Sequence, residues 1–176
     1  MRDPADLIRL YCRDGDAGAF REFYRSQSPR LWKFLVARGC NPEDAYDLVS
    51  EAFLRFVKTV CRDPRAPRAF LYRIATNLRI DALRRTRARP TEPLPAEIAD
   101  KSDESVREQA YHLRELVGRL LEREQNLLLL RYWIGLSHQE VAHALDLPEG
   151  TVRRQCAELI AKLRECWGED ETGTTD

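Results

Sequence analysis

A proline-rich acidic stretch, residues 90–105, limits what this chain can fold into more than any other feature. Its sequence, PTEPLPAEIADKSDES, has three prolines, many acidic residues and no helical repeat of apolar residues, which is the composition of a linker. The stretch divides the chain of 176 residues into two small modules. Each module is long enough to bury a core.

Apolar residues on both sides of this stretch recur at spacings of three and four, without the alternating pattern that indicates strands. We therefore expect an all-α fold with two small helical domains, residues 1–89 and 106–167, joined by a flexible acidic linker. The acidic residues that follow the second domain predict a disordered tail, residues 168–176.

The stretch GLSHQEVAHALDLPEGTVRRQ, residues 135–155, has the pattern of a helix that ends, turns and restarts. Ser137 and Glu140 can form a capping box, so a helix begins at His138; it ends at Asp146, a residue that tolerates a left-handed turn. A second helix follows directly, because a proline and an acid suit its first turn. A helix-turn-helix reads the DNA major groove with this layout, although an ordinary helical hairpin has the same pattern. The candidate duplex-binding residues are Ser137, Thr151, Arg153, Arg154 and Gln155.

The helix predicted to begin at Asn41 and Pro42 has a clean apolar face and an acidic ridge opposite it. The acidic ridge consists of Asp44, Asp47, Glu51 and Arg55. The spacing of three, four and four also fits a solvated face, on which the early acids suit the helix dipole and Glu51 pairs with Arg55.

A basic helix is predicted after the loop CRDPRAPR, over residues 69–89. The first 90 residues hold 19 Lys and Arg against 11 Asp and Glu, and this excess of positive charge suggests a polyanionic partner. Phe70 and Tyr72 lie among the arginines, as on a surface that holds phosphates and unstacked bases, although an arginine-rich solvent face gives the same pattern. One helix face carries Arg73, Asn77, Asp81 and Arg84, and Arg79 and Arg85 add further charge.

Other chemistry is not expected. No apolar run approaches the roughly 20 residues of a membrane span, and the charged N-terminus is unlike a signal peptide, so we expect a cytoplasmic protein. The 5 cysteines form no CxxC pair and are expected to be reduced core thiols. Neither a metal-ligand spacing, a phosphate loop nor a nucleophile elbow is found. We therefore predict no enzymatic activity, no metal and no cofactor.

Three motifs occur in order: NPEDAYDLVSEAFLRF, FLYRIATNLRIDALRR and LLEREQNLLLLRYWIGLSHQEVAHALDLPEGTVRR. Together, around an acidic linker, they resemble bacterial sigma factors of the extracytoplasmic-function (ECF) group of the sigma-70 family, over residues 5–90 and 106–165. The resemblance implies an RNA polymerase sigma factor that directs core polymerase to a promoter set and helps to open the promoter. The first domain would be a region 2 domain that melts the minus-ten element. The second would be a region 4 domain that reads the minus-thirty-five element.

The resemblance also implies roles for individual residues. The acidic ridge would bind the β′ clamp helices of polymerase, because an acidic face complements a basic partner, and the second domain would meet the β flap. An anti-sigma factor would be a further partner of a chain that is expected to be monomeric when free. The strand opened at the promoter would be held by Arg62, Arg65, Arg68, Arg73, Asn77, Arg84 and Arg85.

Several positions depart from the family pattern. Gln155, Glu158 and Ile160 stand where arginines are common, and fewer cations weaken the contact with phosphates. We therefore expect the second domain to bind duplex DNA weakly by itself and to rely on tethering by polymerase. Two other interpretations stay open: a stand-alone helix-turn-helix regulator, and a sigma-like adaptor with weakened promoter binding.

Overall fold

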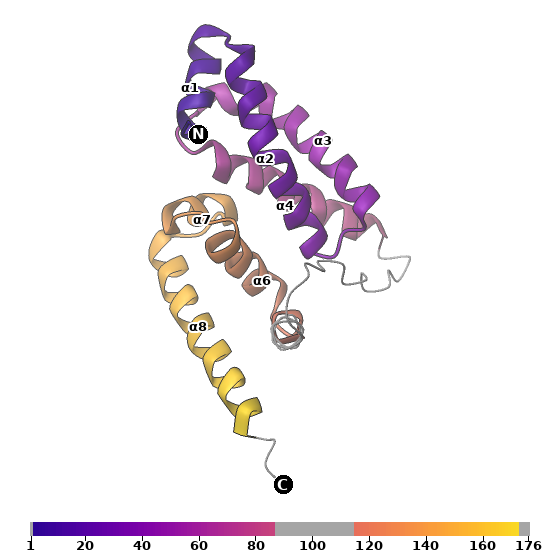
Figure 1. The fold of residues 1–176 in the computed structure, drawn as a ribbon, viewed down its shortest axis with the longest axis vertical. Coiled ribbons are helices and arrows are strands. Elements are labelled where there is room, and N and C mark those ends of the chain that lie inside the picture. Colours follow the sequence, from indigo (N-terminus) through magenta and orange to yellow (C-terminus); the bar gives the residue numbers. More distant parts are fainter. Residues whose placement is uncertain (1, 87–114, 173–176) are drawn as a thin grey trace, which may run out of the picture.

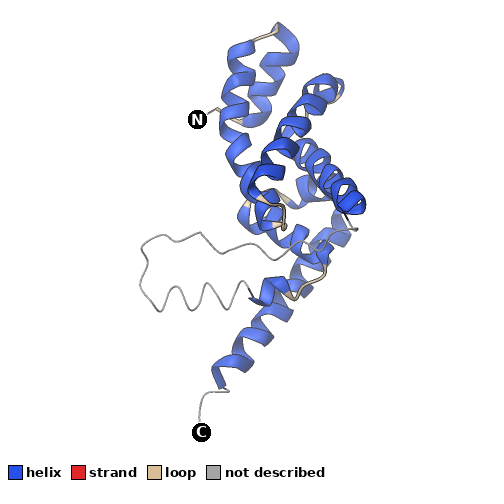
Figure 2. Ribbon diagram, turned by 90° about the vertical axis from the view of Figure 1, so that its right-hand side faces the viewer, coloured by secondary structure: helices blue, strands red, loops and turns tan. Residues whose placement is uncertain are grey.

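The computed structural model describes residues 2–86 and 115–172, and the regular structure in these ranges is entirely helical (Figure 2). Helices α1 to α4 form one bundle, and α6 to α8 form a second group beside it (Figure 1). The predictions of an all-α fold, two helical domains and a helix-turn-helix in the second are confirmed. The predicted linker, residues 90–105, lies outside the described residues.

Side-chain caps mark three helix starts in the first domain, including the start predicted at Asn41 and Pro42. Asp3, Asp16 and Asn41 each accept a backbone N–H through a side-chain oxygen at a helix start, which satisfies a donor that the helix itself cannot pair. Pro29 lies inside the second helix without ending it. The elements are α1 (Pro4–Asp14), α2 (Ala17–Ala37), α3 (Pro42–Thr59), the 3-10 turn η1 (Val60–Arg62) and α4 (Pro67–Thr86).

Aromatic rings fill the core of the first domain. Phe23 stacks on Phe56 with 5.2 Å between ring centroids, and Phe34 meets Tyr72 edge to face at 5.2 Å. All four side chains are fully buried, and each such ring pair contributes about 0.5–1.5 kcal/mol beyond its area burial. Tyr72 therefore belongs to the core. The prediction that it lies on a base-handling surface is wrong, because its face of α4 turns inward.

The helix-turn-helix of the second domain is capped as predicted. Ser137 Oγ accepts from the N–H of Glu140 at 3.1 Å, and Glu140 Oε2 accepts from the N–H of Ser137 at 2.8 Å. Asp146 has a φ of 57°, a left-handed conformation that a short polar side chain tolerates. The elements are α6 (Glu122–Leu128), the π-helical turn η2 (Leu129–Trp133), α7 (His138–Leu145) and α8 (Glu149–Thr172).

The last helix is longer than expected. Residues 168–172 belong to α8, so the prediction of a disordered tail from residue 168 is wrong for this part. Gly168 has the lowest helix propensity of these residues, and a single glycine costs a helix only about 1 kcal/mol relative to alanine. Residues 173–176 lie outside the described residues.

Two cysteines form a disulfide. Cys12 of α1 and Cys61 of η1 are bonded, with Cα atoms 5.2 Å apart and a separation of 49 positions in sequence. The prediction that the cysteines are all reduced is wrong, because their scattered positions do not reveal that the end of α1 meets the end of α3. Cys40, Cys156 and Cys166 are free, and Cys156 is buried as a core thiol should be.

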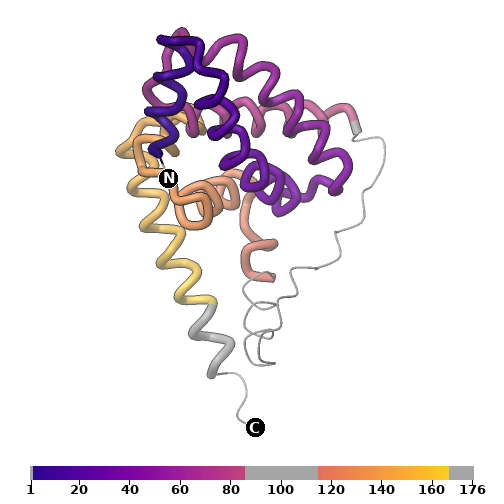
Figure 3. The backbone as a smooth tube through the Cα atoms, turned by 45° about the horizontal axis from the view of Figure 1, so that its top comes forward, coloured from indigo at the N-terminus to yellow at the C-terminus, as the bar shows by residue number. Residues whose placement is uncertain are grey.

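The two domains pack against each other mainly through α4 and α7. Figures 1 and 3 show the helix-turn-helix lying against the first domain while the rest of α8 extends away from it. The domain contact therefore lies where the sequence predicts DNA-binding surfaces.

Among the described helices, none combines the length and the apolar character needed to cross a membrane.

Candidate polymerase and nucleic-acid interfaces

The acidic ridge lies on a solvent-facing side of α3. Glu51 Oε1 accepts from Arg55 Nε at 2.6 Å, so the second half of the ridge is neutralised by its own ion pair. Asp44 Oδ2 accepts from Asn41 Nδ2 at 2.7 Å, and among the described residues Asp47 has no ion-pair partner. Uncompensated negative charge is therefore concentrated on Asp44 and Asp47.

Two exposed apolar side chains of α3 were not predicted as part of this surface. Tyr46 is 62% exposed and Leu54 is 56% exposed. The ring of Tyr46 lies 5.4 Å from that of Trp32, centroid to centroid. Leu54 follows Asp47 by seven residues and so shares its helix face. Its position outside the repeating apolar face of α3 was the sequence signal that could have identified it.

Four candidate strand-binding residues remain in solvent: one in η1 before α4, one in the middle of α4 and two in its last turn. Arg62, Asn77, Arg84 and Arg85 are exposed. Arg84 Nη1 lies 3.6 Å from the carboxylate of Asp81, and Arg85 donates to the backbone oxygen of the same residue at 3.2 Å. These arginines are held only by weak, solvated contacts that a phosphate could replace.

The loop before α4 positions another candidate arginine. Arg65 donates from Nε and Nη2 to the two carboxylate oxygens of Asp63, each at 2.8 Å. These hydrogen bonds lower the pKa of Asp63 to about 2, because they stabilise its ionised form. The guanidinium of Arg65 is nonetheless 87% exposed, so it can exchange this carboxylate for another anion.

Two half-buried candidate strand-binding residues contact the second domain. Arg68 Nη2 donates to the backbone oxygen of Ile134 at 2.7 Å. Arg73 Nη2 lies 3.3 Å from the carboxylate of Asp146, the residue at the turn of the helix-turn-helix. In this arrangement, α4, which is predicted to bind the opened strand, therefore contacts the helix-turn-helix, which is predicted to bind duplex DNA.

A buried polar network joins the domains further along α4. Arg38 and Arg79 are 4% and 7% exposed. Arg38 donates to Asn126 Oδ1 at 2.6 Å and to Gln125 Oε1. Arg79 donates to Glu122 Oε1 at 2.5 Å and to the backbone oxygen of Arg38 at 2.8 Å. The expectation that Arg79 adds exposed charge is wrong, because its side chain turns towards the second domain.

Among the described residues, this network holds two cations and one carboxylate. Burial and the neighbouring Arg79 lower the pKa of Arg38 to about 10, because both disfavour its charged form. The carboxylate of Glu122 is 53% exposed, so it is less desolvated than the arginines that it faces. The domain contact is thus rich in hydrogen bonds but incompletely neutralised.

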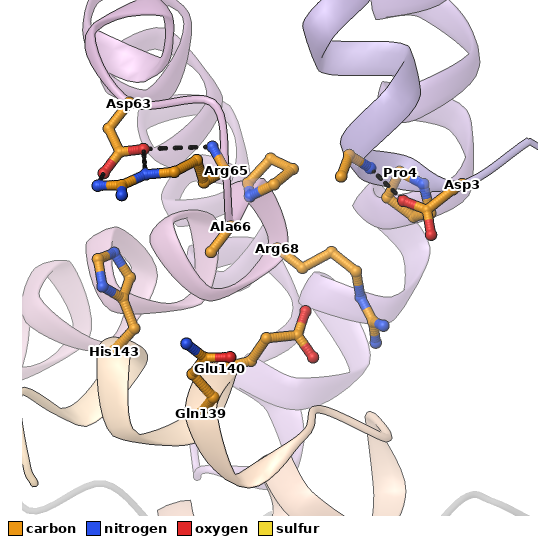
Figure 4. Close-up of a pocket in the computed structure, with 11 residues that line it drawn as sticks. Asp3, Pro4, Asp63, Arg65, Ala66, Arg68, Gln139, Glu140 and His143 are labelled. Atoms are coloured by element: carbon orange, nitrogen blue, oxygen red, sulfur yellow. Dashed lines mark hydrogen bonds and ion pairs between the residues drawn. The ribbon is translucent and has the colours of Figure 1, made fainter. Parts of the chain in front are cut away.

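A cavity of about 570 Å³ lies between the loop before α4 and the start of α7 (Figure 4). His143 points from α7 towards the pair formed by Asp63 and Arg65. The other polar side chains of the wall include Asp3, Arg68, Gln139 and Glu140. Within the parts of the chain that the structure describes, no three His, Cys, Asp or Glu side chains come together as metal ligands.

The arginines predicted to face duplex DNA are exposed at the start of α8, and both are paired. Arg153 Nη2 lies 2.7 Å from Glu149 Oε1, and Arg154 Nη1 lies 3.1 Å from Glu158 Oε1. Both pairs join residues four apart on one helix. Such pairs are worth only about 0.3–0.5 kcal/mol, but each places a carboxylate beside the cation that a phosphate would need.

The remaining duplex-binding candidates are less available. The hydroxyl of Ser137 caps α7, so its first role is structural. Thr151 and Gln155 are half-buried. The structure places Thr151, Arg153, Arg154 and Gln155 in the first two turns of α8 and Ser137 at the start of α7, and it leaves Arg153 and Arg154 as the most accessible of the five.

Known proteins match both domains. Residues 23–89 match the family model of Sigma-70 region 2, and residues 116–165 match that of Sigma-70, region 4. An RNA polymerase sigma-E factor from Streptomyces avermitilis is 30% identical over 158 residues, covering 86% of each chain. The ECF RNA polymerase sigma factor SigM from Mycobacterium tuberculosis is 29% identical over 176 residues, covering 98% of this chain and 88% of SigM.

A solved structure has the same fold over almost the whole chain. The structure of CnrH in complex with the cytosolic domain of CnrY gives a TM-score of 0.68 at 21% identity, covering 96% of this chain and 99% of CnrH. The two family matches fall on the two helical domains that the three sequence motifs indicated. The chain therefore belongs to the ECF group of the sigma-70 family and is an RNA polymerase sigma factor.

Proposed function

We propose that this sigma factor docks on core RNA polymerase through α3, holds the opened promoter strand on α4 and its preceding loop, and reads duplex DNA with α7 and α8. One observation carries the proposal: the acidic ridge faces solvent, whereas α4 and α7 cover each other. Polymerase can therefore reach the first surface without disturbing the domain contact.

The composition of the α3 surface supports docking on a basic partner. Asp44 and Asp47 supply charge that is not neutralised within the described chain, and complementary charge speeds encounter and fixes register. Leu54 and Tyr46 supply apolar area beside that charge. A polar rim around an apolar centre is the usual anatomy of a protein interface.

DNA binding would require the two domains to separate. A phosphate of the opened strand would compete with Asp146 for Arg73, which now lies 3.3 Å from that carboxylate. The free chain would then be mostly closed, and polymerase and promoter would favour the open form to the extent that they bind it more tightly. This coupling would keep a free sigma factor off DNA.

Partners and location follow as part of the same proposal. CnrH binds the cytosolic domain of CnrY, and we infer that an anti-sigma factor could stabilise the closed form of this chain by binding it preferentially. Work with polymerase and promoter DNA implies the cytoplasm. The polymerase would supply the chemistry of RNA synthesis, so the chain needs no catalytic site or cofactor of its own.

Run-off transcription tests the proposal. Purified full-length protein is added to core polymerase and fragments of genomic DNA, and new start sites that depend on the protein are expected. Polymerase binding without new start sites would favour the adaptor interpretation. Duplex binding without polymerase binding would favour the stand-alone regulator.

A further inference from the structure

We propose that Cys12 and Cys61 form a reversible redox site whose oxidised form restrains the strand-binding loop, residues 62–68. The reactants would be dithiols and disulfides. The restraint on DNA binding rests on the proposed function of that loop. The reversibility of the bond stands on geometry alone.

One cysteine of the disulfide is the residue immediately before the loop. Cys61 immediately precedes Arg62, and its bond to Cys12 fixes this end of the loop to the last turn of α1. Pro67, at the start of α4, is buried and fixes the other end. A loop that is fixed at both ends can adopt few conformations. Its arginines therefore cannot move to reach an opened DNA strand that lies away from their present positions.

The restrained conformation favours the closed arrangement over strand capture. Arg65 is held by Asp63, and Arg68 reaches Ile134 of the second domain. Asp3 and Pro4, at the start of α1, line the cavity that separates this loop from α7 (Figure 4). The disulfide therefore joins α1 to the residue before the loop, and the start of α1 and the loop both line the cavity that faces α7.

Helix α1 is also attached to α2 by its apolar face, and the ring of Tyr11 lies 5.0 Å from that of Phe20, centroid to centroid. Leu7 and Ile8 are its fully buried side chains, at 1% and 0% exposure. The disulfide adds a covalent link between residues 49 positions apart in sequence, and this link encloses α2 and α3. Its loss would separate the end of α1 from the adjoining loop while the aromatic core of the domain stays intact.

Solvent reagents can reach this bond. Cys61 is exposed and Cys12 is half-buried, and a hollow of about 630 Å³ lined by Arg9, Arg13 and Pro64 opens beside Cys12. Thiol–disulfide exchange requires access to the attacked sulfur. The geometry therefore favours attack on Cys61, with Cys12 as the leaving group.

A dithiol alone can reduce the disulfide, and no other reactant is needed. A thiolate of the dithiol attacks Cys61 Sγ, the bond between the two cysteines breaks, and Cys12 leaves and takes a proton. The second thiol of the dithiol then displaces Cys61, so two electrons and two protons pass from the dithiol to the pair. Exchange with a disulfide compound reverses these steps. Disulfides of cytosolic proteins are usually transient or redox-sensing, which matches the proposed location.

The first experiment counts thiols in the folded full-length protein. Dithiothreitol followed by alkylation and mass spectrometry should label Cys12 and Cys61, and oxidised glutathione should remove both sites from labelling reversibly. This result does not depend on DNA. A bond that opens only when the protein is unfolded would overturn the proposed redox site.

The second experiment measures binding of the two redox forms to a labelled single-stranded DNA of mixed sequence, in the presence of core polymerase. The reduced form should bind about three- to tenfold more tightly, because the loop side chains are then free to order on the strand. Equal or tighter binding by the oxidised form would overturn the restraint. Absence of binding in both forms would refute the strand-binding role as well, whereas the thiol count would still decide the redox site.

Matched variants separate the disulfide from general effects of thiol reagents. Cys12→Ser combined with Cys61→Ser should bind like the reduced protein in either buffer. Cys166→Ser removes a half-buried thiol far along α8 and should keep the full redox response. If the double variant does not fold, chemically reduced natural protein provides the same comparison.

Discussion

The two surfaces that the first domain would use in transcription differ in what covers them. The α3 surface meets solvent, whereas α4 is covered by the second domain through Arg68, Arg73 and Arg79. A chain built in this way can find polymerase while its DNA-binding side chains are occupied. The contrast suggests that docking comes first and that DNA binding follows the release of the second domain.

The contact over α4 is stable but can be released. Arg38 and Arg79 are desolvated, and among the described residues one half-exposed carboxylate, Glu122, faces both. Buried ion pairs repay their desolvation only when geometry and neutralisation are nearly complete. The hydrogen bonds to Asn126 and Gln125 therefore give the contact specificity, while the excess cation limits its strength.

Reversing the charge of Glu122 should have the largest effect on the difference between the exposed α3 surface and the covered α4 surface. Glu122→Lys would place a third cation beside Arg38 and Arg79 and destabilise the domain contact by about 1–3 kcal/mol, less than for a fully buried pair because the carboxylate is half-exposed. Small-angle scattering should show a larger radius of gyration, and single-stranded DNA should bind more tightly.

The matched control for this change is Glu115→Lys. Glu115 pairs with Arg119 within the second domain and is exposed, so the same change of charge should leave the radius of gyration as it is. If Glu122→Lys stays as compact as Glu115→Lys, the polar network does not hold the domains together.

Charge reversal on the acidic ridge tests the uncovered surface. Asp47→Lys should weaken binding to core polymerase by about 1–2 kcal/mol, whereas Glu51→Lys should have a smaller effect, because Arg55 already neutralises Glu51. Surface plasmon resonance with immobilised core polymerase measures both. Thermal unfolding should be nearly unchanged, since exposed charges contribute little to stability.

Glu115→Lys serves again as the control for charge alone. Equal losses of polymerase affinity in Asp47→Lys and Glu51→Lys would show that polymerase breaks the ion pair between Glu51 and Arg55 on docking. Unchanged affinity in both variants would remove α3 as the docking surface.

Local features of the fold could be predicted from the sequence, whereas contacts between distant residues could not. The capping box of Ser137 and Glu140 and the left-handed turn at Asp146 depend on side chains within a few residues of each other. The hydrogen bond from Arg38 to Asn126 joins residues 88 positions apart. An arginine that turns to another domain gives the same helical pattern as one in solvent, so Arg79 was misplaced.

The candidate site residues divide in the same way, into local features that were predicted and contacts between distant residues that were not. The exposed ridge on α3 was predicted from helical spacing alone, because Asp44, Asp47 and Glu51 lie opposite a regular apolar face. The disulfide was missed because no spacing rule relates Cys12 to Cys61, and the occupation of Arg73 was missed because it depends on how two domains pack.

Truncating the exposed leucine of α3 should have a smaller effect than charge reversal at Asp47. Leu54→Ala should weaken polymerase binding by about 1 kcal/mol, the loss expected for part of a side chain's apolar burial. The melting temperature should hardly change, because Leu54 is 56% exposed in the free protein. Calorimetric titration against core polymerase, with thermal unfolding beside it, distinguishes lost binding from lost fold. A fall in melting temperature with unchanged affinity would mean that Leu54 supports the helix and not the docking surface.

Neutralising two acids of α8 should have the smallest effect and should act in the opposite direction. Glu149→Gln combined with Glu158→Gln would free Arg153 and Arg154 from their ion pairs and should strengthen duplex binding by about 0.5–1 kcal/mol, as two weak surface pairs allow. Each arginine released to a phosphate should also add about 0.9 to the slope of log affinity against log salt concentration. Fluorescence anisotropy with promoter duplex over a salt series measures both quantities. Glu122→Lys acts on the contact between the domains, whereas these changes act on ion pairs within α8, so the two effects should add. A strengthening seen only in the opened variant would instead show that the closed arrangement already keeps α8 from DNA, and that its acids matter only after release.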